Sequence, residues 1–181
     1  MPPTPTQWNP ISINEIQSLC GDFEDWVLCG GHSVALFTGD DRRPHGDIDI
    51  SIFRSQAVAC LQAIGKQKVF LAANKTLVPW DGSPIPDEVH DIWIANPESN
   101  EWILQIMIYD DDEDRVYYRR NRAISWSKES HSFMKDGIRI LNPFVTFLFK
   151  SNQPNLEPKE IDDLIQLIEK GVGVQWKKES D

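Results

Sequence analysis

Apolar residues recur along most of the chain with either helical or strand spacing, and the two spacings alternate. Ser12 followed by Glu15 forms a capping-box pattern, which predicts that a first helix begins near residue 13. Asn142 followed by Pro143 is a preferred start of another helix. A last helix is expected to open at Pro158. Its expected apolar face consists of Ile161, Leu164, Ile165 and Ile168, and its expected end is Gly171.

The other elements are predicted from short apolar runs bounded by glycine, proline, asparagine or charged residues. The expected strands are 26–29, 46–53, 68–72, 75–79, 88–95, 101–109, 115–118 and 137–141. The expected helices are 13–20, 32–38, a helix capped by Ser55 that closes near Gly65, and the two that begin at residues 143 and 158. This order predicts an α+β fold with helices mainly on one face of a sheet. We expect an extended leader over 1–10, a core over 11–141 and a small C-terminal helical segment over 142–181.

Composition and charge exclude several classes of protein. The 181 residues suffice for one domain with a core of its own. Acidic residues outnumber basic ones by 28 to 18, and a net charge of −10 argues against a long groove for DNA or RNA. The same charge is compatible with a cationic substrate, and equally with the ordinary acidity of a cytoplasmic protein. No apolar run approaches the ~18 residues that a membrane-spanning helix needs, so we expect no membrane partner.

The cysteines and the N-terminus indicate the cellular compartment. Cys20, Cys29 and Cys60 lie in apolar surroundings and lack a metal-binding spacing, which predicts buried, reduced thiols. The first six residues lack the basic and apolar regions of a secretory signal. We therefore expect a cytoplasmic protein.

Candidate chemistry is concentrated in one segment. Asp47 and Asp49 are two residues apart in an expected strand, so their side chains share a face. Adjacent carboxylates repel each other unless a cation lies between them, and hard oxygen ligands suit Mg²⁺ or Mn²⁺. Upstream, Gly30 and Gly31 form a turn that opens a helix, where backbone N–H groups suit a phosphate. The competing interpretations are a solvated acidic strand start and an ordinary strand-to-helix turn.

The spacing of these residues carries a family resemblance. Gly30-Gly31 is followed by Gly39 and then by Arg43-x-His45-x-Asp47-x-Asp49. This pattern resembles the signature of the nucleotidyltransferase superfamily, and within it the small antibiotic nucleotidyltransferases that adenylylate aminoglycosides or lincosamides. The family's Trp is His32 here, its Ala is Ser33, and its early Asp is Ala35, so any role of that carboxylate is absent. The resemblance is strong over residues 26–54 and weaker beyond them.

The resemblance implies a nucleotidyltransferase-like mixed sheet with the metal site at its edge. It also implies an enzyme that moves a nucleoside monophosphate from an NTP such as ATP to a hydroxyl of an acceptor, releasing pyrophosphate. Asp47 and Asp49 would hold two Mg²⁺ ions about 3.5–4 Å apart. Asp91 is our candidate for a third carboxylate, acting as general base or metal ligand. Its competing interpretations are an edge-strand aspartate and an ion pair in the neighbourhood of His90. The rival third carboxylates are Asp87, Glu88 and Glu101.

The resemblance further implies a set of nucleotide-binding residues. The expected set is Gly30, Gly31, Ser33, Arg43, His45 and Lys150. The glycine turn would contact the triphosphate through its backbone, Ser33 would add a hydroxyl, and Arg43 with His45 would order the loop before the carboxylates. The alternatives are a loop salt bridge from Arg43 to a neighbouring aspartate, and a Lys150 that only stabilises its own helix C-terminus.

Two other functions compete with a small-molecule transferase. One is a toxin–antitoxin nucleotidyltransferase that acts on tRNA or on a protein partner. The other is a nucleotide-binding module that has lost turnover, against which the intact carboxylates argue. The acceptor and the donor base stay open, and a chain of this size is compatible with a homodimer that shares its active site.

Overall fold

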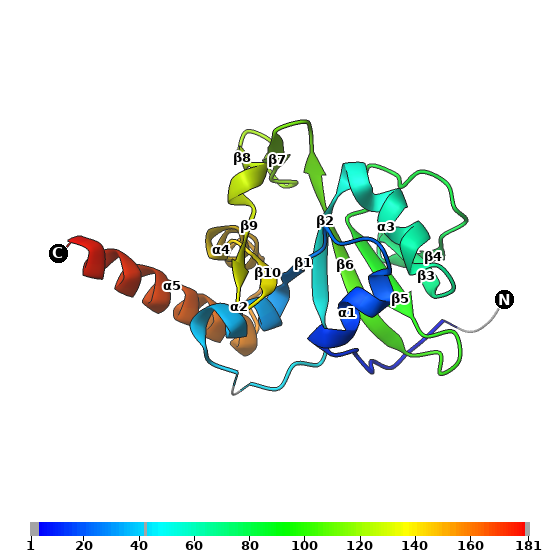
Figure 1. Ribbon diagram of the computed structural model, residues 1–181, viewed down its shortest axis with the longest axis horizontal. Coiled ribbons are helices and arrows are strands. Elements are labelled where there is room, and N and C mark those ends of the chain that lie inside the picture. The colour runs from blue at the N-terminus through cyan, green and yellow to red at the C-terminus, as the bar shows by residue number, and fades with distance from the viewer. Residues whose placement is uncertain (1–3, 42, 180–181) are drawn as a thin grey trace.

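The structure is a computed structural model that describes residues 4–41 and 43–179, with side chains described as far as residue 171. Figure 1 shows a twisted sheet with helices packed around it. The strands in the described residues are β1 (Val27–Cys29), β2 (Asp49–Phe53), β3 (Lys68–Ala73), β4 (Thr76–Pro79), β5 (Asp91–Ala95), β6 (Trp102–Asp111), β7 (Arg115–Tyr117), β8 (Ser125–Ser127), β9 (Ser132–Lys135) and β10 (Ile138–Leu141). The α-helices are α1 (Ile13–Cys20), α2 (Gly30–Thr38), α3 (Ala57–Ile64), α4 (Pro143–Ser151) and α5 (Pro158–Glu179), and short 3₁₀ turns span Arg54–Gln56 and Lys128–Ser130.

The order of the strands determines which side chains meet. They are hydrogen-bonded in the order β4-β3-β5-β6-β2-β1-β10-β9, with β7 on β6 and β8 on β7. The pairs β1–β10 and β2–β6 are parallel and the others are antiparallel, so the expected mixed sheet and α+β class are confirmed. One row of paired residues crosses four strands through Cys29, Asp49, Gln105 and Trp93. Paired residues of neighbouring strands point to the same face of a sheet, so this row presents its side chains together.

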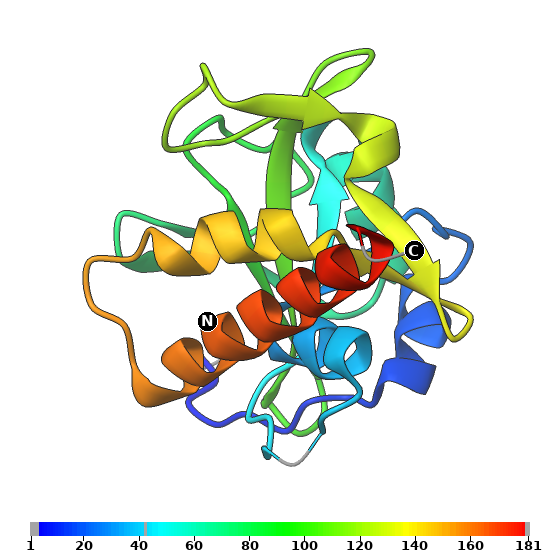
Figure 2. The same cartoon turned by 90° about the vertical axis from the view of Figure 1, so that its left-hand side faces the viewer.

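Alternating residues of the central strands separate two apolar layers. On one face Ile50 and Ile106 are fully buried against Leu61 of α3 and Ile16 of α1. Figure 1 shows α1 and α3 in front of the sheet at this face. The opposite face, which carries Cys29, packs on α4. In Figure 2, α5 lies between α2 and α4, and it packs on both of them.

The strand that carries the aspartates is shorter than expected. β2 begins at Asp49 rather than near Gly46, because Cys29 pairs with Asp49 and the chain then turns away into α2. Asp47 therefore has no strand beside it on that side. It precedes the sheet in an irregular segment, although the next residue, Ile48, still accepts a hydrogen bond from the backbone of Gln105 at 3.0 Å.

The predicted cap of α3 is wrong. The Ser55 hydroxyl donates to Oδ2 of Asp111 at 2.6 Å, and the Ser55 backbone N–H donates to Oδ1 of the same carboxylate at 3.0 Å. These bonds tie Ser55 to the end of β6, so it does not act as a helix cap. A 3₁₀ turn intervenes and α3 begins two residues later, at Ala57.

The last helix differs from its prediction in length and in orientation. It continues through Gly171 to Glu179. Of the predicted apolar face only Leu164 is buried, together with Leu167 and Asp163, and α5 packs on α2 and α4. The other predicted residues, Ile161, Ile165 and Ile168, are 43–49% exposed. The expected Pro143 start of α4 is confirmed, with the Asn142 side chain accepting a hydrogen bond from the backbone of Phe144 at 2.9 Å.

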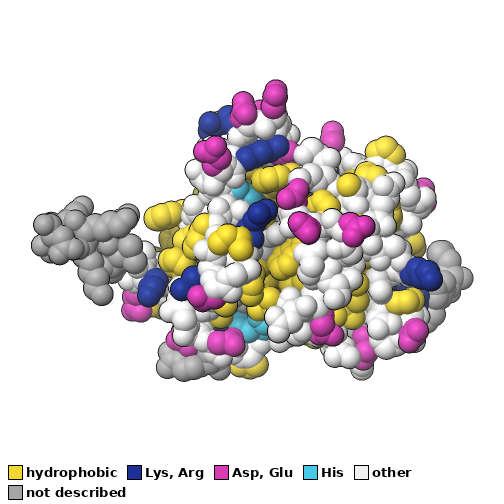
Figure 3. Space-filling model, viewed as in Figure 1, with side chains coloured by type: hydrophobic (Ala, Val, Ile, Leu, Met, Phe, Trp, Pro, Cys, Tyr) yellow, Lys and Arg dark blue, Asp and Glu magenta, His cyan; other side chains and the backbone are white. Residues whose placement is uncertain are grey.

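Two strands, β8 and β9, were not predicted because their short sequences lack an apolar run. β8 is the tripeptide Ser-Trp-Ser. The segment before α1 is attached to the sheet through a bridge between Trp8 and Trp102, and the backbone N–H of Asn9 donates to the carbonyl oxygen of Trp102 at 2.9 Å. Within the described residues, no helix combines the length and apolar character needed to cross a membrane. Figure 3 shows the same face of the molecule in space-filling form, with acidic side chains spread over its surface.

Candidate active site

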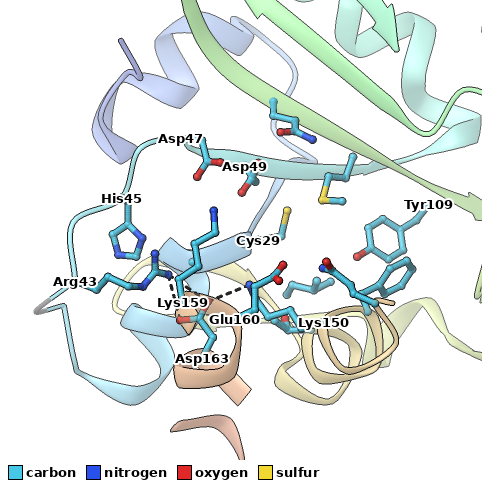
Figure 4. A pocket seen from close by; sticks show the side chains of 18 of the residues that line it. Cys29, Arg43, His45, Asp47, Asp49, Tyr109, Lys150, Lys159, Glu160 and Asp163 are labelled. Carbon is cyan, nitrogen blue, oxygen red and sulfur yellow. Dashed lines mark hydrogen bonds and ion pairs between the residues drawn. The ribbon is translucent and has the colours of Figure 1, made fainter. Parts of the chain in front are cut away.

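A cavity of about 270 Å³ lies on the face of the sheet opposite α1 and α3. It is bounded by the start of β2, the N-terminus of α2, and the helices α4 and α5 (Figure 4). Most of the predicted site residues line it, namely Gly30, Gly31, Arg43, His45, Asp47, Asp49 and Lys150. Ser33 and Asp91 are not among its lining residues. The sequence signature therefore converges on one cavity, with two exceptions.

The two carboxylates of the signature lie together and have no counter-charge bound to them. Asp47, just before β2, and Asp49, the first residue of β2, both point into the cavity (Figure 4). Among the described residues, neither one has a hydrogen-bonding or ion-pair partner. Burial raises the pKa of Asp49 to about 7, and the negative charge of Asp47 acts in the same direction. A carboxylate in such surroundings is stabilised by any cation that enters the cavity.

The glycine turn is required by the side chains that approach it. Gly30 opens α2 at a φ of +66°, a conformation that side chains rarely adopt, and a Cβ atom there would collide with the Asp49 carboxylate. A Cβ atom on Gly31 would lie 2.6 Å from Nη2 of Arg43 and 2.7 Å from Nδ1 of His45. The glycines thus bring the N-terminus of α2 against the carboxylate and the basic side chains. This local crowding explains both glycines without a bound phosphate and is compatible with one.

Ser33 has a structural contact instead of a place in the cavity. The residue is 2% exposed, and its hydroxyl donates to the carbonyl oxygen of Gly30 at 2.9 Å. The predicted hydroxyl contact with a triphosphate has no support in this position.

Two basic side chains are joined by an acidic residue that the sequence analysis did not select. Nη2 of Arg43 lies 3.1 Å from Asp163, and Nζ of Lys150 lies 3.0 Å from the same carboxylate. The Asp163 side chain is only 4% exposed, so it holds both cations in a fixed position (Figure 4). The ion pair of Arg43 thus reaches α5 rather than a neighbour in its own loop. The available signal was an acidic residue beside Leu164, on the buried face of the last helix.

The histidines border the cavity from the loop before β2. Nε2 of His45 lies 3.3 Å from Asp41, and its ring lies on that of His32 with 4.2 Å between the ring centroids. Burial, together with the neighbouring His45, lowers the pKa of His32. A loop contact of this kind was one interpretation of the Arg43-x-His45 segment, and His45 makes it with Asp41.

The predicted third carboxylate lies two strands away from the pair. Asp91 is on β5, and β6 runs between β5 and β2. Its carboxylate is 3.4 Å from the Gln105 side-chain amide, and 3.5 Å from Nη1 of Arg119. It lines a separate neighbouring cavity, which shares Arg119 with the first. Because β5 lies between β3 and β6, Asp91 is not on an edge strand, whereas an ion pair was among the interpretations offered by the sequence.

The described residues contain no cluster of three or more His, Cys, Asp or Glu side chains that could hold a metal ion. A pair of carboxylates without partners still suits Mg²⁺, which commonly binds one or two carboxylates together with water and substrate phosphates. Asp47 and Asp49 are the residues that would hold it. Basic side chains that line the same cavity would complement an anionic ligand, and they are Arg43, Arg119, Arg120, Lys150 and Lys159.

Comparison with known proteins extends the fold assignment. No protein-family model matches this chain, and no curated protein matches it. The chain is similar in structure to the lincosamide antibiotic adenylyltransferase LnuA, whose crystal structure is lincomycin-bound. The TM-score is 0.57 at 17% sequence identity, with 88% of this chain and 98% of that chain covered. At this identity the similarity concerns the fold, which is nucleotidyltransferase-like.

Proposed function

We propose that this protein is a metal-dependent nucleotidyltransferase. It would transfer a nucleoside monophosphate from an NTP to a hydroxyl group of a small-molecule acceptor, with Mg²⁺ or Mn²⁺ as its metal. The observation that carries the proposal is the carboxylate pair Asp47 and Asp49, which lacks protein partners among the described residues and lies at the N-terminus of α2. The fold shared with an antibiotic adenylyltransferase supports the same reaction class and a small-molecule acceptor.

The charges of the cavity favour a polyanionic donor. Five basic side chains line it in a protein whose net charge is −10. Asp163 fixes Arg43 and Lys150 near the glycine turn, while Lys159 extends from α5 toward the carboxylates (Figure 4). Backbone N–H groups at the start of α2 add a favourable dipole for phosphate. These groups would bind and orient the triphosphate.

The reaction needs little from the protein besides position and charge. The acceptor oxygen forms a bond to the α-phosphorus, and the bond from that phosphorus to the bridging oxygen breaks. Pyrophosphate leaves with the electron pair of the broken bond. A metal held by Asp47 and Asp49 would neutralise phosphate charge and make the acceptor hydroxyl more acidic. Asp91, which is separated from the pair by β6, is better suited to take the acceptor proton than to complete the metal set.

Isothermal titration calorimetry tests the proposal with ATP, GTP, CTP and UTP, each with and without Mg²⁺. We expect one NTP to bind in a metal-dependent manner. Asp47→Asn and Asp49→Asn should abolish this binding, while the matched exposed-site variant Asp22→Asn should retain it. A folded wild-type protein that binds none of the four nucleotides would refute the proposal.

A transfer assay with the NTP labelled at its α-phosphate then separates the remaining alternatives. Label that passes to an aminoglycoside or a lincosamide supports a small-molecule acceptor. Label that passes to a tRNA pool would instead support the tRNA-directed alternative. Metal-dependent NTP binding with no release of pyrophosphate from the NTP in the presence of any of these acceptors would indicate a non-catalytic nucleotide-binding module.

A further inference from the structure

Arg119 lies at the border between two cavities. One is the candidate active site, and the other has a volume of about 500 Å³ and is lined by the β3–β4 hairpin and by Asp91 and Trp93 of β5. Among the described lining residues, Arg119 alone is common to both. Its guanidinium carbon lies 5.9 Å from the centre of the Phe149 ring, which belongs to the active-site cavity. The side chain therefore has access to ligands on either side.

The other fixed cations of the cavity are held more firmly than Arg119. Arg43 and Lys150 share the buried Asp163 at 3.1 and 3.0 Å. Arg120 donates to the carbonyl oxygens of Phe149 at 3.1 Å and of Asn152 at 2.8 Å.

Within the part of the chain that the structure describes, Arg119 has a single ion pair. Its partner is Asp91 at 3.5 Å, and both side chains of that pair are more than one quarter exposed. A partly exposed pair of this length is weak, so a stronger anion can displace the carboxylate.

A nucleoside triphosphate is such an anion. Arginine binds phosphate through two parallel N–H···O bonds, and these charge-assisted bonds are roughly twice as strong as neutral ones. A triphosphate in the active-site cavity would therefore compete with Asp91 for the Arg119 guanidinium. The competition has a consequence for Asp91, because Arg119 faces its Oδ2 atom while Gln105 faces Oδ1. Departure of Arg119 would leave Oδ2 free to accept a proton from a second ligand.

We propose that Arg119 couples the two cavities by exchanging Asp91 for the donor triphosphate, so that donor binding frees Asp91 to receive the acceptor's hydroxyl proton. The inference rests on the proposed nucleotidyl transfer. In the step that follows, the proton moves from the acceptor oxygen to Oδ2 of Asp91 as that oxygen bonds to the α-phosphorus. Pyrophosphate leaves as before. The donor therefore binds first, and the second cavity receives the acceptor.

A double-mutant cycle tests the exchange without knowledge of the acceptor. Calorimetry measures the Kd of the bound Mg·NTP for the wild type, Asp91→Asn, Arg119→Met and the double variant. Asp91→Asn removes the competing carboxylate, so it should tighten NTP binding about 2- to 5-fold. Arg119→Met should weaken binding at least about tenfold, since a charge-assisted phosphate contact is lost. In the Arg119→Met background, Asp91→Asn should have no further effect.

Arg122 provides the matched control. It is 65% exposed, pairs with Asp110 at 3.5 Å, and is absent from the described lining of both cavities. Arg122→Met should leave the Kd unchanged, and Arg119→Lys should restore part of the lost affinity by keeping the charge.

The outcomes separate this inference from the proposed function. An Asp91→Asn variant that fails to tighten NTP binding, or that tightens it equally without Arg119, overturns the coupling alone. If no NTP binds the wild type, the proposed function fails and the coupling fails with it. NTP binding that requires Asp47 and Asp49, together with the predicted result of the double-mutant cycle, supports both the proposed function and the coupling.

Discussion

Replacement of a site carboxylate should stabilise this protein at neutral pH. Burial and the charge of Asp47 raise the pKa of Asp49 to about 7, from an ordinary value of 3.8. Between these two pH values the folded protein keeps the Asp49 proton while the unfolded chain has lost it. Stability therefore falls as pH rises through this interval, by about 1.36 kcal/mol per pH unit and by ~4 kcal/mol in total. The amide introduced by Asp49→Asn carries no charge at any of these pH values, so the variant avoids this loss.

Urea unfolding followed by tryptophan fluorescence provides the measurement, at intervals between pH 4 and pH 8 without added metal. Asp49→Asn should exceed the wild type by up to ~4 kcal/mol at pH 8 and should match it near pH 4. Mg²⁺ should stabilise the wild type at pH 8 and leave the variant unchanged. The exposed Asp22→Asn should change stability by under ~0.5 kcal/mol throughout. Equal stability of Asp49→Asn and the wild type at pH 8 would refute the argument that burial penalises this charge.

Two further substitutions test the construction of the cavity, both by urea unfolding. Gly30→Ala should lower the free energy of unfolding by ~1–3 kcal/mol, because its methyl group meets the Asp49 carboxylate at a positive φ; an unchanged unfolding midpoint would argue against this close approach. Asp163→Asn should lower it by ~3–5 kcal/mol, because two basic side chains lose their buried partner, and the exposed neighbour Asp162→Asn serves as its control. Equal effects at positions 162 and 163 would contradict the assigned role.

The parts of the site that could be predicted are close together in sequence. The glycine turn and the two aspartates belong to one strand–helix–strand unit, and local rules for strands and helix starts bring them to one cavity. Asp163 and Arg119 reach the same cavity from α5 and from the segment after β7. Their positions depend on how distant elements pack, which periodicity alone does not determine.

The position of Asp91 illustrates a second limit. Its alternating segment correctly predicted a strand, but sequence order does not reveal that β6 is inserted between that strand and β2. The insertion depends on a parallel pairing between β2 and β6, whose paired residues are 56 positions apart in the sequence. The buried face of α5 was also not determined by periodicity. The neighbours α2 and α4 decide which face is covered, so Leu164 and Leu167 are buried while Ile161, Ile165 and Ile168 are exposed.

The strand order, in which β6 separates Asp91 from Asp49, also indicates the size of the acceptor. Neighbouring strands are ~4.8 Å apart, so side chains of β2 and β5 that share a row are separated by ~10 Å across β6. Asp49 and Trp93 are such a pair, with Gln105 between them. Asp91 lies on the same face of β5 as Trp93, two residues earlier, and pairs with Met107 of β6. A triphosphate beside Asp49 and an acceptor seated on Trp93 would therefore meet above β6, where Arg119 now contacts Asp91. An acceptor several ångströms across, the size of a sugar ring, fits this separation, and a longer polymer is not needed to bridge it.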